Sequence, residues 1–338
     1  MVLIRADANQ QIGSGHVMRC LSIAKAFARA GHEVMFVTSD HLGDALIRNN
    51  GFRNISLETQ WKELERDGLD EVIGRFSPEL LLVDSYFVTE AYLSTLSSVV
   101  PVAYIDDMNS AIWNVDFLIN YNIFGTVMDY SGYEKTRTKL ILGPRYAPLR
   151  DEFQNSGIHE IHGVKNIMVS AGGSDPEGIT EKIIENVCDE LKDIVFHFIV
   201  GALNPRLRII QALAAARQNV ILHINEKRMA ERMKSCDIAI SAAGSTLYEL
   251  SACGTPTITY ALADNQLIAT DEFDKQGVML SAGDCRNNGD FIAGLTALTK
   301  RLIDDAELRS EMSRRMQAIV DGNGASRIVN KLLGTTDL

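Results

Sequence analysis

Short apolar runs alternate with amphipathic segments along most of this chain, and that alternation constrains the fold more than any other feature of the sequence. Runs such as 34–38 and 80–84 have the length of buried strands, whereas 17–30 repeats apolar residues at helical spacing. Strands that alternate with helices form parallel sheets covered by helices on both faces. The pattern therefore predicts an α/β protein. Strands are expected over 2–4, 34–38, 80–84, 102–105, 117–120, 166–171, 195–200, 220–224, 237–241 and 256–260, and helices over 17–30, 43–50, 60–76, 89–99, 176–192, 204–217, 226–235, 245–253, 298–315 and 326–333.

The chain is expected to form two domains, because its 338 residues exceed what one hydrophobic core usually holds. The stretch 144–165, with two prolines and two glycines among polar residues, interrupts the alternation and is typical of a linker. We expect an N-terminal Rossmann-like domain over 1–155, a second over 163–320 and a C-terminal helix over 321–338. A cleft between the two domains would hold the ligand.

Charge and cysteine content exclude several classes of partner. The net charge of −11 leaves no broad basic surface for nucleic acid or an anionic membrane. The five cysteines lack CxxC spacing, and neither a secretory signal nor an 18-residue apolar run is present. We therefore expect a cytoplasmic protein with a small-molecule substrate and no nucleic-acid or membrane partner. A monomer is compatible with the sequence, which does not determine the oligomeric state.

A polar loop with two glycines follows the first apolar run and precedes a helix. Such a loop presents backbone N–H groups to an anion, so Gly13 and Gly15 are predicted to contact substrate. The positive end of a helix disfavours an imidazolium ion, which makes His16 a candidate general base, although a bound diphosphate would act in the opposite direction. Arg5 and Asp7, at the end of the apolar run, are also predicted to contact substrate. A tight turn without chemistry is the alternative interpretation.

A second glycine loop follows the strand expected over 166–171. Gly172, Gly173 and Ser174 come directly after it and are predicted to bind a phosphate, although they could serve only to cap the next helix. Asn265 and Gln266, after a later strand, are predicted to contribute amide groups to a sugar or a phosphate.

A third loop has the same layout and adds a carboxylate. Gly244, Ser245 and Thr246 follow an apolar strand and open a helix, and Glu249 lies one turn further on. A carboxylate there can accept hydrogen bonds from both ribose hydroxyls of a nucleotide whose phosphates lie at the helix end. A capping box is the alternative, but Glu249 is one position too late for it if Ser245 is the cap.

Acidic residues stand at the ends of two expected strands, where open α/β sheets place ligands. Asp84 ends one strand, and Asp106 and Asp107 follow the next. Only one of two neighbouring acids can face a given point, and no histidine or cysteine joins them. We therefore predict neither a metal ion nor a cofactor.

Seven segments occur in this order in a known family, and they extend from residue 2 to about residue 285. They are RADANQQIGSGHVMRCLSIA, LLVDSYFV, YIDDM, LINYNI, LGPRYAPLRDEF, AGGSDPEG and SAAGSTLYEL. With them the chain resembles the PseG family, the UDP-2,4-diacetamido-2,4,6-trideoxy-β-L-altropyranose hydrolases of pseudaminic acid biosynthesis. Its second half is more distantly similar to MurG-like glycosyltransferases of the GT-B fold.

The resemblance implies a GT-B architecture and metal-independent hydrolysis of a UDP-sugar at its anomeric carbon. It implies that His16 is the catalytic histidine, that Tyr86 is the active-site tyrosine, and that the second and third loops hold the nucleotide. The resemblance makes flagellin glycosylation one expected context. Related proteins also occur in other surface-polysaccharide pathways, so the substrate could instead be a related nucleotide sugar.

The expected mechanism is attack by water on the face of C1 opposite to UDP, which inverts the anomeric centre. UDP is a good leaving group, so one histidine base can suffice without the carboxylate pair of ordinary glycosidases. Three alternatives remain open: an inverting GT-B glycosyltransferase, a sugar-nucleotide 2-epimerase and a non-catalytic nucleotide-sugar binding protein.

Overall fold

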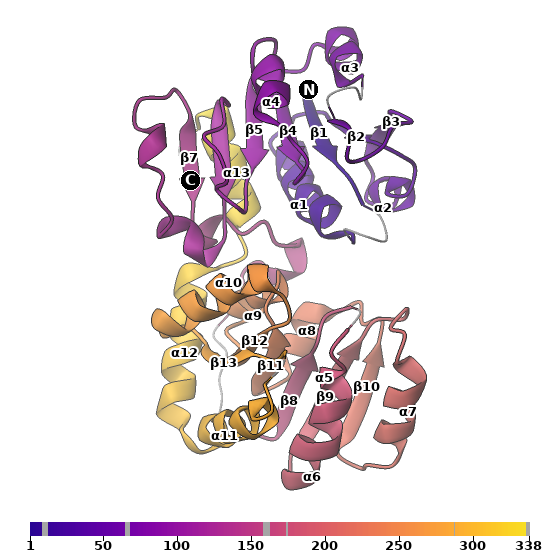
Figure 1. Cartoon of the computed structure of the whole chain (residues 1–338), viewed down its shortest axis with the longest axis vertical. Helices are drawn as coiled ribbons and strands as arrows, with labels where there is room; N and C mark the ends of the chain where they lie inside the picture. The colour runs from indigo at the N-terminus through magenta and orange to yellow at the C-terminus, as the bar shows by residue number, and fades with distance from the viewer. Residues whose placement is uncertain (9–12, 65–67, 158–162, 174, 287, 336–338) are drawn as a thin grey trace. The chain divides into compact units, whose positions relative to one another are not determined.

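The computed structural model describes residues 1–8, 13–64, 68–157, 163–173, 175–286 and 288–335. It divides the chain into two compact units, coloured by chain position in Figure 1. The first unit comprises Met1–Asp151 and Asn323–Leu338, and the second comprises Glu152–Gly322.

The first unit is built on a seven-stranded sheet with the order β3-β2-β1-β4-β5-β6-β7, in which all neighbours are parallel. The winding direction reverses between β1 and β4, and open sheets bind ligands beside the carboxyl ends of strands at such a point. The strands are β1 (Val2–Ala6), β2 (Val34–Thr38), β3 (Arg53–Ser56), β4 (Leu80–Asp84), β5 (Val102–Ile105), β6 (Phe117–Asn120) and β7 (Lys139–Leu142).

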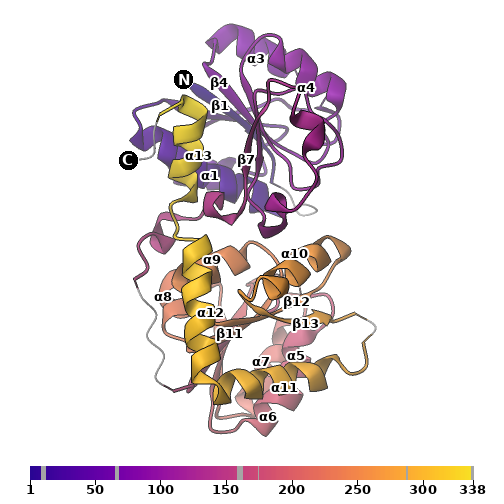
Figure 2. The ribbon, with the colours of Figure 1, turned by 90° about the vertical axis from the view of Figure 1, so that its left-hand side faces the viewer.

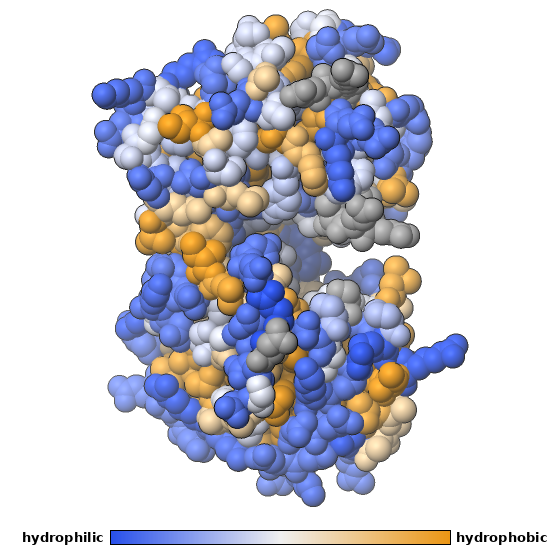
Figure 3. Space-filling view, in the orientation of Figure 1, coloured by the Kyte–Doolittle hydropathy of each residue, from blue (hydrophilic) through white to orange (hydrophobic). Residues whose placement is uncertain are grey.

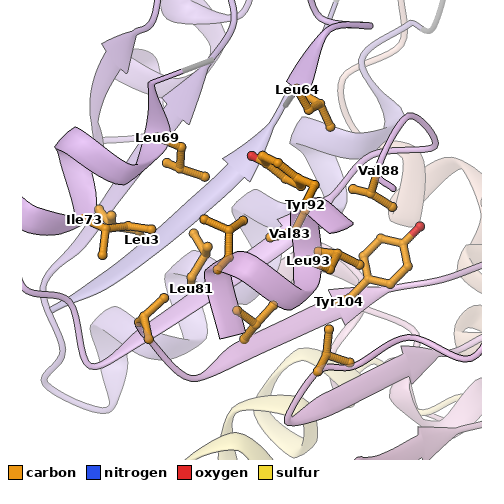
Figure 4. Close-up of a cluster of buried hydrophobic side chains, with 14 of the residues drawn as sticks. Leu3, Leu64, Leu69, Ile73, Leu81, Val83, Val88, Tyr92, Leu93 and Tyr104 are labelled. Carbon is orange, nitrogen blue, oxygen red and sulfur yellow. The ribbon is translucent and has the colours of Figure 1, made fainter. Parts of the chain in front are cut away.

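Helices cover both faces of this sheet, so its central strands are buried along their whole length. Figure 4 shows part of the apolar core, in which Leu81 and Val83 of β4 pack among side chains from the neighbouring helices. The helices are α1 (Gly15–Arg29), α2 (Asp44–Asn49), α3 (Leu69–Phe76), α4 (Glu90–Ser97) and α13 (Gly324–Leu333), with 3-10 turns η2 (Ile123–Thr126), η3 (Ser131–Tyr133), η4 (Pro144–Tyr146) and η5 (Asp151–Phe153), the last of which begins at the boundary of the unit.

The last helix of the chain, α13, packs in the first unit against α1 and η4. Figure 2 shows it beside α1. Gly324 begins this helix, and a Cβ atom there would overlap the backbone of Ala147. The contact therefore requires glycine. Sequence periodicity predicted the helix but could not indicate what it packs against.

The second unit repeats the arrangement with six parallel strands in the order β10-β9-β8-β11-β12-β13. Here the winding direction reverses between β8 and β11. Its strands are β8 (Asn166–Ser170), β9 (Val195–Val200), β10 (Val220–Ile224), β11 (Ile238–Ala242), β12 (Thr257–Ala261) and β13 (Leu280–Asp284). Its helices are α5 (Ile179–Lys182), the π-helical turn η6 (Ile183–Val187), α6 (Cys188–Glu190), α7 (Leu207–Ala215), α8 (Met229–Lys234), α9 (Thr246–Cys253), α10 (Asp264–Lys275), α11 (Phe291–Asp304) and α12 (Ala306–Ile319).

The predicted α/β class with two Rossmann-like sheets is confirmed, and the errors lie in individual elements. The single helix expected over 298–315 is wrong: Asp305 is extended and its side chain caps α12, which separates α11 from α12. The helix expected over 60–76 covers only Leu69–Phe76 among the described residues. The strands β3, β7 and β13 were not predicted.

Apolar residues on the face in Figure 3 occur in small groups on a mainly hydrophilic surface. Across the described part of the chain, no helix combines the length and the apolar character needed to cross a membrane.

Candidate active site

His16 lies at the point of strand reversal in the first unit, paired with an aspartate of the adjacent strand. It is the second residue of α1, and Asp84 is the last residue of β4, opposite Ala6 of β1. The Nδ1 atom of His16 lies 2.6 Å from Oδ1 of Asp84. A carboxylate can only accept, so Nδ1 carries the proton and Nε2 of the neutral ring keeps a lone pair. This is the arrangement of a histidine oriented to act as a base.

Arg19 holds Asp84 from the other side. It is three residues after His16 on α1, so both side chains project from one face of the helix. Its Nε and Nη2 atoms each donate to one oxygen of Asp84 at 2.6 Å, and the Cys20 thiol lies 3.4 Å from Oδ2. Burial opposes ionisation of Asp84, but the charge of Arg19 and the hydrogen bonds from Arg19 and His16 outweigh it and hold the pKa of Asp84 well below its usual range. Asp84 is therefore a fixed anion beneath His16.

The same arginine contacts a second carboxylate, Asp107, in the loop after β5. Nη1 of Arg19 donates to Oδ2 of Asp107 and to the hydroxyl of Tyr121, each at 2.8 Å. Asn122 donates to the other Asp107 oxygen at 2.9 Å. Loops after three neighbouring strands thus meet in one polar network.

Tyr86 connects this network to the surface. Its hydroxyl donates to Asp107 at 2.8 Å, and its ring lies edge-on to His16 with 4.7 Å between ring centres. Partial burial and the Asp107 carboxylate raise the pKa of Tyr86 well above its usual range, although the side chain is 46% exposed. Because its only proton is directed to Asp107, the phenol oxygen can act toward a ligand only as an acceptor.

Two residues predicted to contact substrate are instead packed inside the unit. Arg5 is fully buried and donates to Asp7 and to Ser39, each at 2.7 Å. Asp7 also accepts from the Ser39 backbone amide. These contacts give Arg5 and Asp7 a structural role that joins β1 to the residue after β2, and their substrate contact stays a prediction that the packing does not favour.

The glycine loop before α1 is only partly described. Gly13 has a φ of 70°, a backbone conformation that favours glycine, and neither Gly13 nor Gly15 has an atom near the position of an added Cβ. Residues 9–12 lie outside the described part. Open space at both glycines is compatible with the predicted approach of a ligand.

The acidic residues at the strand ends already accept hydrogen bonds from other protein groups. Asp106 is buried and accepts from the Trp113 ring nitrogen and from the amides of Met108 and Asn109. Asp84 and Asp107 both accept hydrogen bonds from Arg19. Within the described ranges, no group of three or more His, Cys, Asp or Glu side chains is arranged to hold a metal ion.

In the second unit, the loop after β8 leaves open space at its two glycines. Gly172 has a φ of 78°, and a Cβ atom at Gly172 or Gly173 would meet nothing within 4 Å. Buried Asp175 accepts from the amides of Ile179 and Thr180 and so caps α5. The predicted contact at Ser174 lies outside the described residues.

The loop after β11 leads directly into α9, whose N-terminal residue is Thr246. Ser245 occupies the N-cap position without a capping side-chain hydrogen bond, and Gly244 and Ser245 are exposed. Glu249 is the fourth residue of the helix, so it is not in the capping-box position. The exposed helix end can accept an anion, and the partly buried Glu249 stands one turn below it.

Asn265 and Gln266 lie in the first turn of α10, after β12. Asn265 is exposed, whereas the side-chain oxygen of Gln266 accepts from the amide of Leu262 at 2.8 Å. Both residues thus lie at the same edge of the second sheet as the loops after β8 and β11. Their predicted ligand contacts stay predictions, and Gln266 has only its NH₂ group to offer.

Sequence reasoning missed the residues that surround His16. It assigned no role to Arg19, Tyr121 or Asn122, and it considered Asp84 and Asp107 only as metal ligands. One available signal was the spacing of Arg19 from His16, which places both on one helix face. The partner strand of β1, and hence the position of Asp84, could be inferred only from the strand order.

The two parallel sheets with their helices have the GT-B fold, as comparison with solved structures shows. Acinetobacter baumannii MurG superposes with a TM-score of 0.71 at 15% identity, covering 99% of both chains. The calicheamicin glycosyltransferase CalG4 superposes with a TM-score of 0.66 at 15% identity, covering 100% of this chain and 99% of that one. At this identity the likeness shows the fold alone.

Several relatives are similar in sequence, and the hydrolase among them confirms the resemblance found above, although no family model matches the chain. The spore coat polysaccharide biosynthesis protein SpsG of Bacillus subtilis is 24% identical over 96% of this chain and 95% of its own length. A UDP-2,4-diacetamido-2,4,6-trideoxy-beta-L-altropyranose hydrolase of Campylobacter jejuni is 25% identical over 73% of this chain and 86% of its own length. An uncharacterized protein of Methanocaldococcus jannaschii is 25% identical over 81% of this chain, but the match spans only 58% of that protein.

Proposed function

We propose that the protein hydrolyses a UDP-sugar, with His16 as the general base that activates water. The observation that carries this proposal is the pairing of His16 Nδ1 with Asp84 at 2.6 Å, which leaves Nε2 as the proton acceptor. No described residue donates to or accepts from Nε2. A neutral ring with its proton on Nδ1 can accept a further proton at Nε2.

The proposed chemistry divides between the two units. The second unit binds UDP, with the diphosphate at the open glycine loop and the N-terminus of α9 and with the ribose hydroxyls on Glu249. The first unit supplies the base. As water bonds to C1, its proton passes to Nε2 of His16, the bond from C1 to the UDP oxygen breaks, and UDP leaves with the electron pair. Asp84 stabilises the imidazolium that forms.

The similarity of the Campylobacter hydrolase supports a 2,4-diacetamido-2,4,6-trideoxyhexose as the sugar. The similarity of the Bacillus spore coat protein supports a related sugar of a surface polysaccharide. We propose the first as the initial substrate to test and place the protein in the processing of UDP-sugars for pseudaminic acid or a similar sugar.

Glycosyl transfer is the second candidate, favoured by the fold that the chain shares with MurG and CalG4. The same base could deprotonate a hydroxyl of an acceptor instead of water. The two activities differ in one observable: a hydrolase releases UDP when no acceptor is present.

The test is UDP release from UDP-2,4-diacetamido-2,4,6-trideoxy-L-altrose without any acceptor. We expect turnover by the wild type and a loss of about two to four orders of magnitude in His16→Asn, the usual contribution of a positioned base. UDP affinity by calorimetry should stay near that of the wild type, because the nucleotide is assigned to the second unit.

The matched control is His41→Gln, since His41 is an exposed histidine of the same unit that pairs with Asp44 and Glu58. This variant should retain full turnover. UDP release only after an acceptor is added would favour the transferase, and full activity of His16→Asn would remove His16 from the chemistry.

A further inference from the structure

Arg19 lies between the carboxylates of Asp84 and Asp107, and in this position its charge affects the protonation of His16. Its guanidinium donates to both oxygens of Asp84 and, through Nη1, to Asp107. The side chain is 11% exposed, and those of Asp84 and Asp107 are 0% and 14% exposed. Charges with so little solvent around them interact more strongly than charges at the surface.

The charges in this network do not balance. One guanidinium faces two carboxylates, so the network has a net charge of −1 while His16 is neutral, and protonation of His16 brings it to zero. Nη2 of Arg19 lies only 3.2 Å from Nδ1 of His16, whereas Asp84 contacts that nitrogen directly. The guanidinium therefore opposes a proton on the imidazole, and both carboxylates favour one.

The remaining titratable groups of the network are neutral. Burial raises the pKa of Tyr121 to about 12, and burial also raises the pKa of the Cys20 thiol well above its usual range. The Tyr86 phenol keeps its proton on Asp107. Arg19, Asp84 and Asp107 are thus the fixed charges in the network around His16.

We propose that Arg19 and Asp107 are positioning residues that adjust, in opposite directions, how readily His16 takes up a proton. Arg19 also fixes the Asp84 carboxylate, and through it the orientation of the imidazole ring. Asp107 anchors Arg19 against Tyr121 and Asn122 and so keeps the guanidinium in place. This inference rests on the proposed role of His16 as the base.

The test is an NMR titration of the His16 imidazole in the whole protein, assigned by its loss in His16→Asn. Arg19→Gln removes the positive charge, so the midpoint should move to higher pH by about half a unit or more. Asp107→Asn removes a negative charge, so the midpoint should move to lower pH. The acidic limb of the kcat profile should move in the same two directions, which loss of packing alone would not produce.

Two further variants separate charge from orientation. Arg19→Lys keeps the charge but lacks the planar fork, so the midpoint should stay near the wild-type value while kcat falls by about 100-fold with little change in KM. Arg29→Gln removes an exposed arginine at the other end of α1, which pairs with Asp151, and should alter neither quantity.

Equal midpoints in all variants, or shifts of the same sign in Arg19→Gln and Asp107→Asn, would overturn the proposal. If Arg19→Gln does not fold, Asp107→Asn and Arg19→Lys still decide it. The titration needs no substrate. A wild type that releases no UDP but shows the two opposite shifts would therefore refute the hydrolase function, while the effect of Arg19 and Asp107 on protonation of His16 would stand.

Discussion

His16 owes its proposed chemistry to residues that are distant in the sequence. Asp84 fixes which ring nitrogen carries the proton, and Arg19 keeps Asp84 ionised despite its burial. An isolated histidine at a helix N-terminus could rotate and exchange tautomers. The pairing with a buried carboxylate removes that freedom, which is the function of the third member in a hydrolytic triad.

Substitution of Glu249 tests the proposed nucleotide site at a single residue. If its carboxylate accepts hydrogen bonds from the ribose, Glu249→Ala should weaken UDP binding by about 1–3 kcal/mol, the range for hydrogen bonds to charged groups. Calorimetric titration with UDP measures this loss, and the thermal stability should change little. Glu231→Ala, at an exposed glutamate of α8 in the same unit, is the matched control. Equal UDP affinity in both variants would remove Glu249 from the site.

The candidate site was only partly predictable from the sequence, for physical reasons. Glycines before a helix can be recognised locally, and these identified His16 and the loops at Gly172 and Gly244. The partners of His16 come from β4 and from the loops after β5 and β6, so their proximity depends on strand order. Asp84 therefore appeared as an isolated acid at the end of a strand, although it lies 2.6 Å from the histidine.

Among the secondary-structure elements, interior strands were predicted well, whereas the edge strands β3, β7 and β13 were missed and the edge strand β10 was predicted with its bounds. The bounds of β2, β4, β5 and β6 match the prediction, because apolar runs buried on both faces end abruptly at polar residues. By contrast, β3 has the sequence RNIS and is only partly buried, and β7 begins with an exposed lysine. An edge strand needs few apolar residues, so its sequence does not differ clearly from that of a loop.

The strands β9 and β10 carry a histidine pair that predicts a pH-dependent stability. Nδ1 of His197 lies 3.0 Å from Nε2 of His223, and the rings stack with their centres 5.2 Å apart. Burial first, and then the charges of His223 and Arg232, lower the pKa of His197 to about 4. Burial and Arg232 also lower the pKa of His223.

Between about pH 6.5, the ordinary value for histidine, and pH 4, the unfolded chain binds protons that the native pair does not. The free energy of unfolding should therefore fall as the pH falls through this range. Calorimetric unfolding at several pH values measures the slope, and His197→Gln should make it shallower. His41→Gln should change this slope little, because a hydrogen bond to Asp44 and the charge of Glu58 raise the pKa of His41, so its native and unfolded states differ in bound protons above about pH 6.5. Parallel slopes for wild type and His197→Gln would contradict this account.

At the scale of the whole molecule, the two units share a strand order but differ in what their loops present. The first unit gathers charged and phenolic side chains around His16, whereas the described loops of the second unit present glycines, a serine and an open helix end. The chain passes from the first unit to the second at Asp151–Glu152 and returns at Gly322–Asn323. The first unit thus presents groups suited to proton transfer, and the second presents groups suited to binding an anion.

The most direct test of the central claim is to identify the bond that water breaks, by turnover of the UDP-sugar in ¹⁸O-labelled water. Attack at the anomeric carbon puts solvent oxygen on C1 of the released sugar, whereas attack at phosphorus puts it into UDP. Since His16 is proposed to direct water to C1, mass spectrometry should find the label in the sugar and none in UDP, with the same rate in the presence of EDTA. Label in UDP, with activity lost to EDTA and restored by Mg²⁺, would contradict the account and return Asp84, Asp106 and Asp107 to consideration as metal ligands.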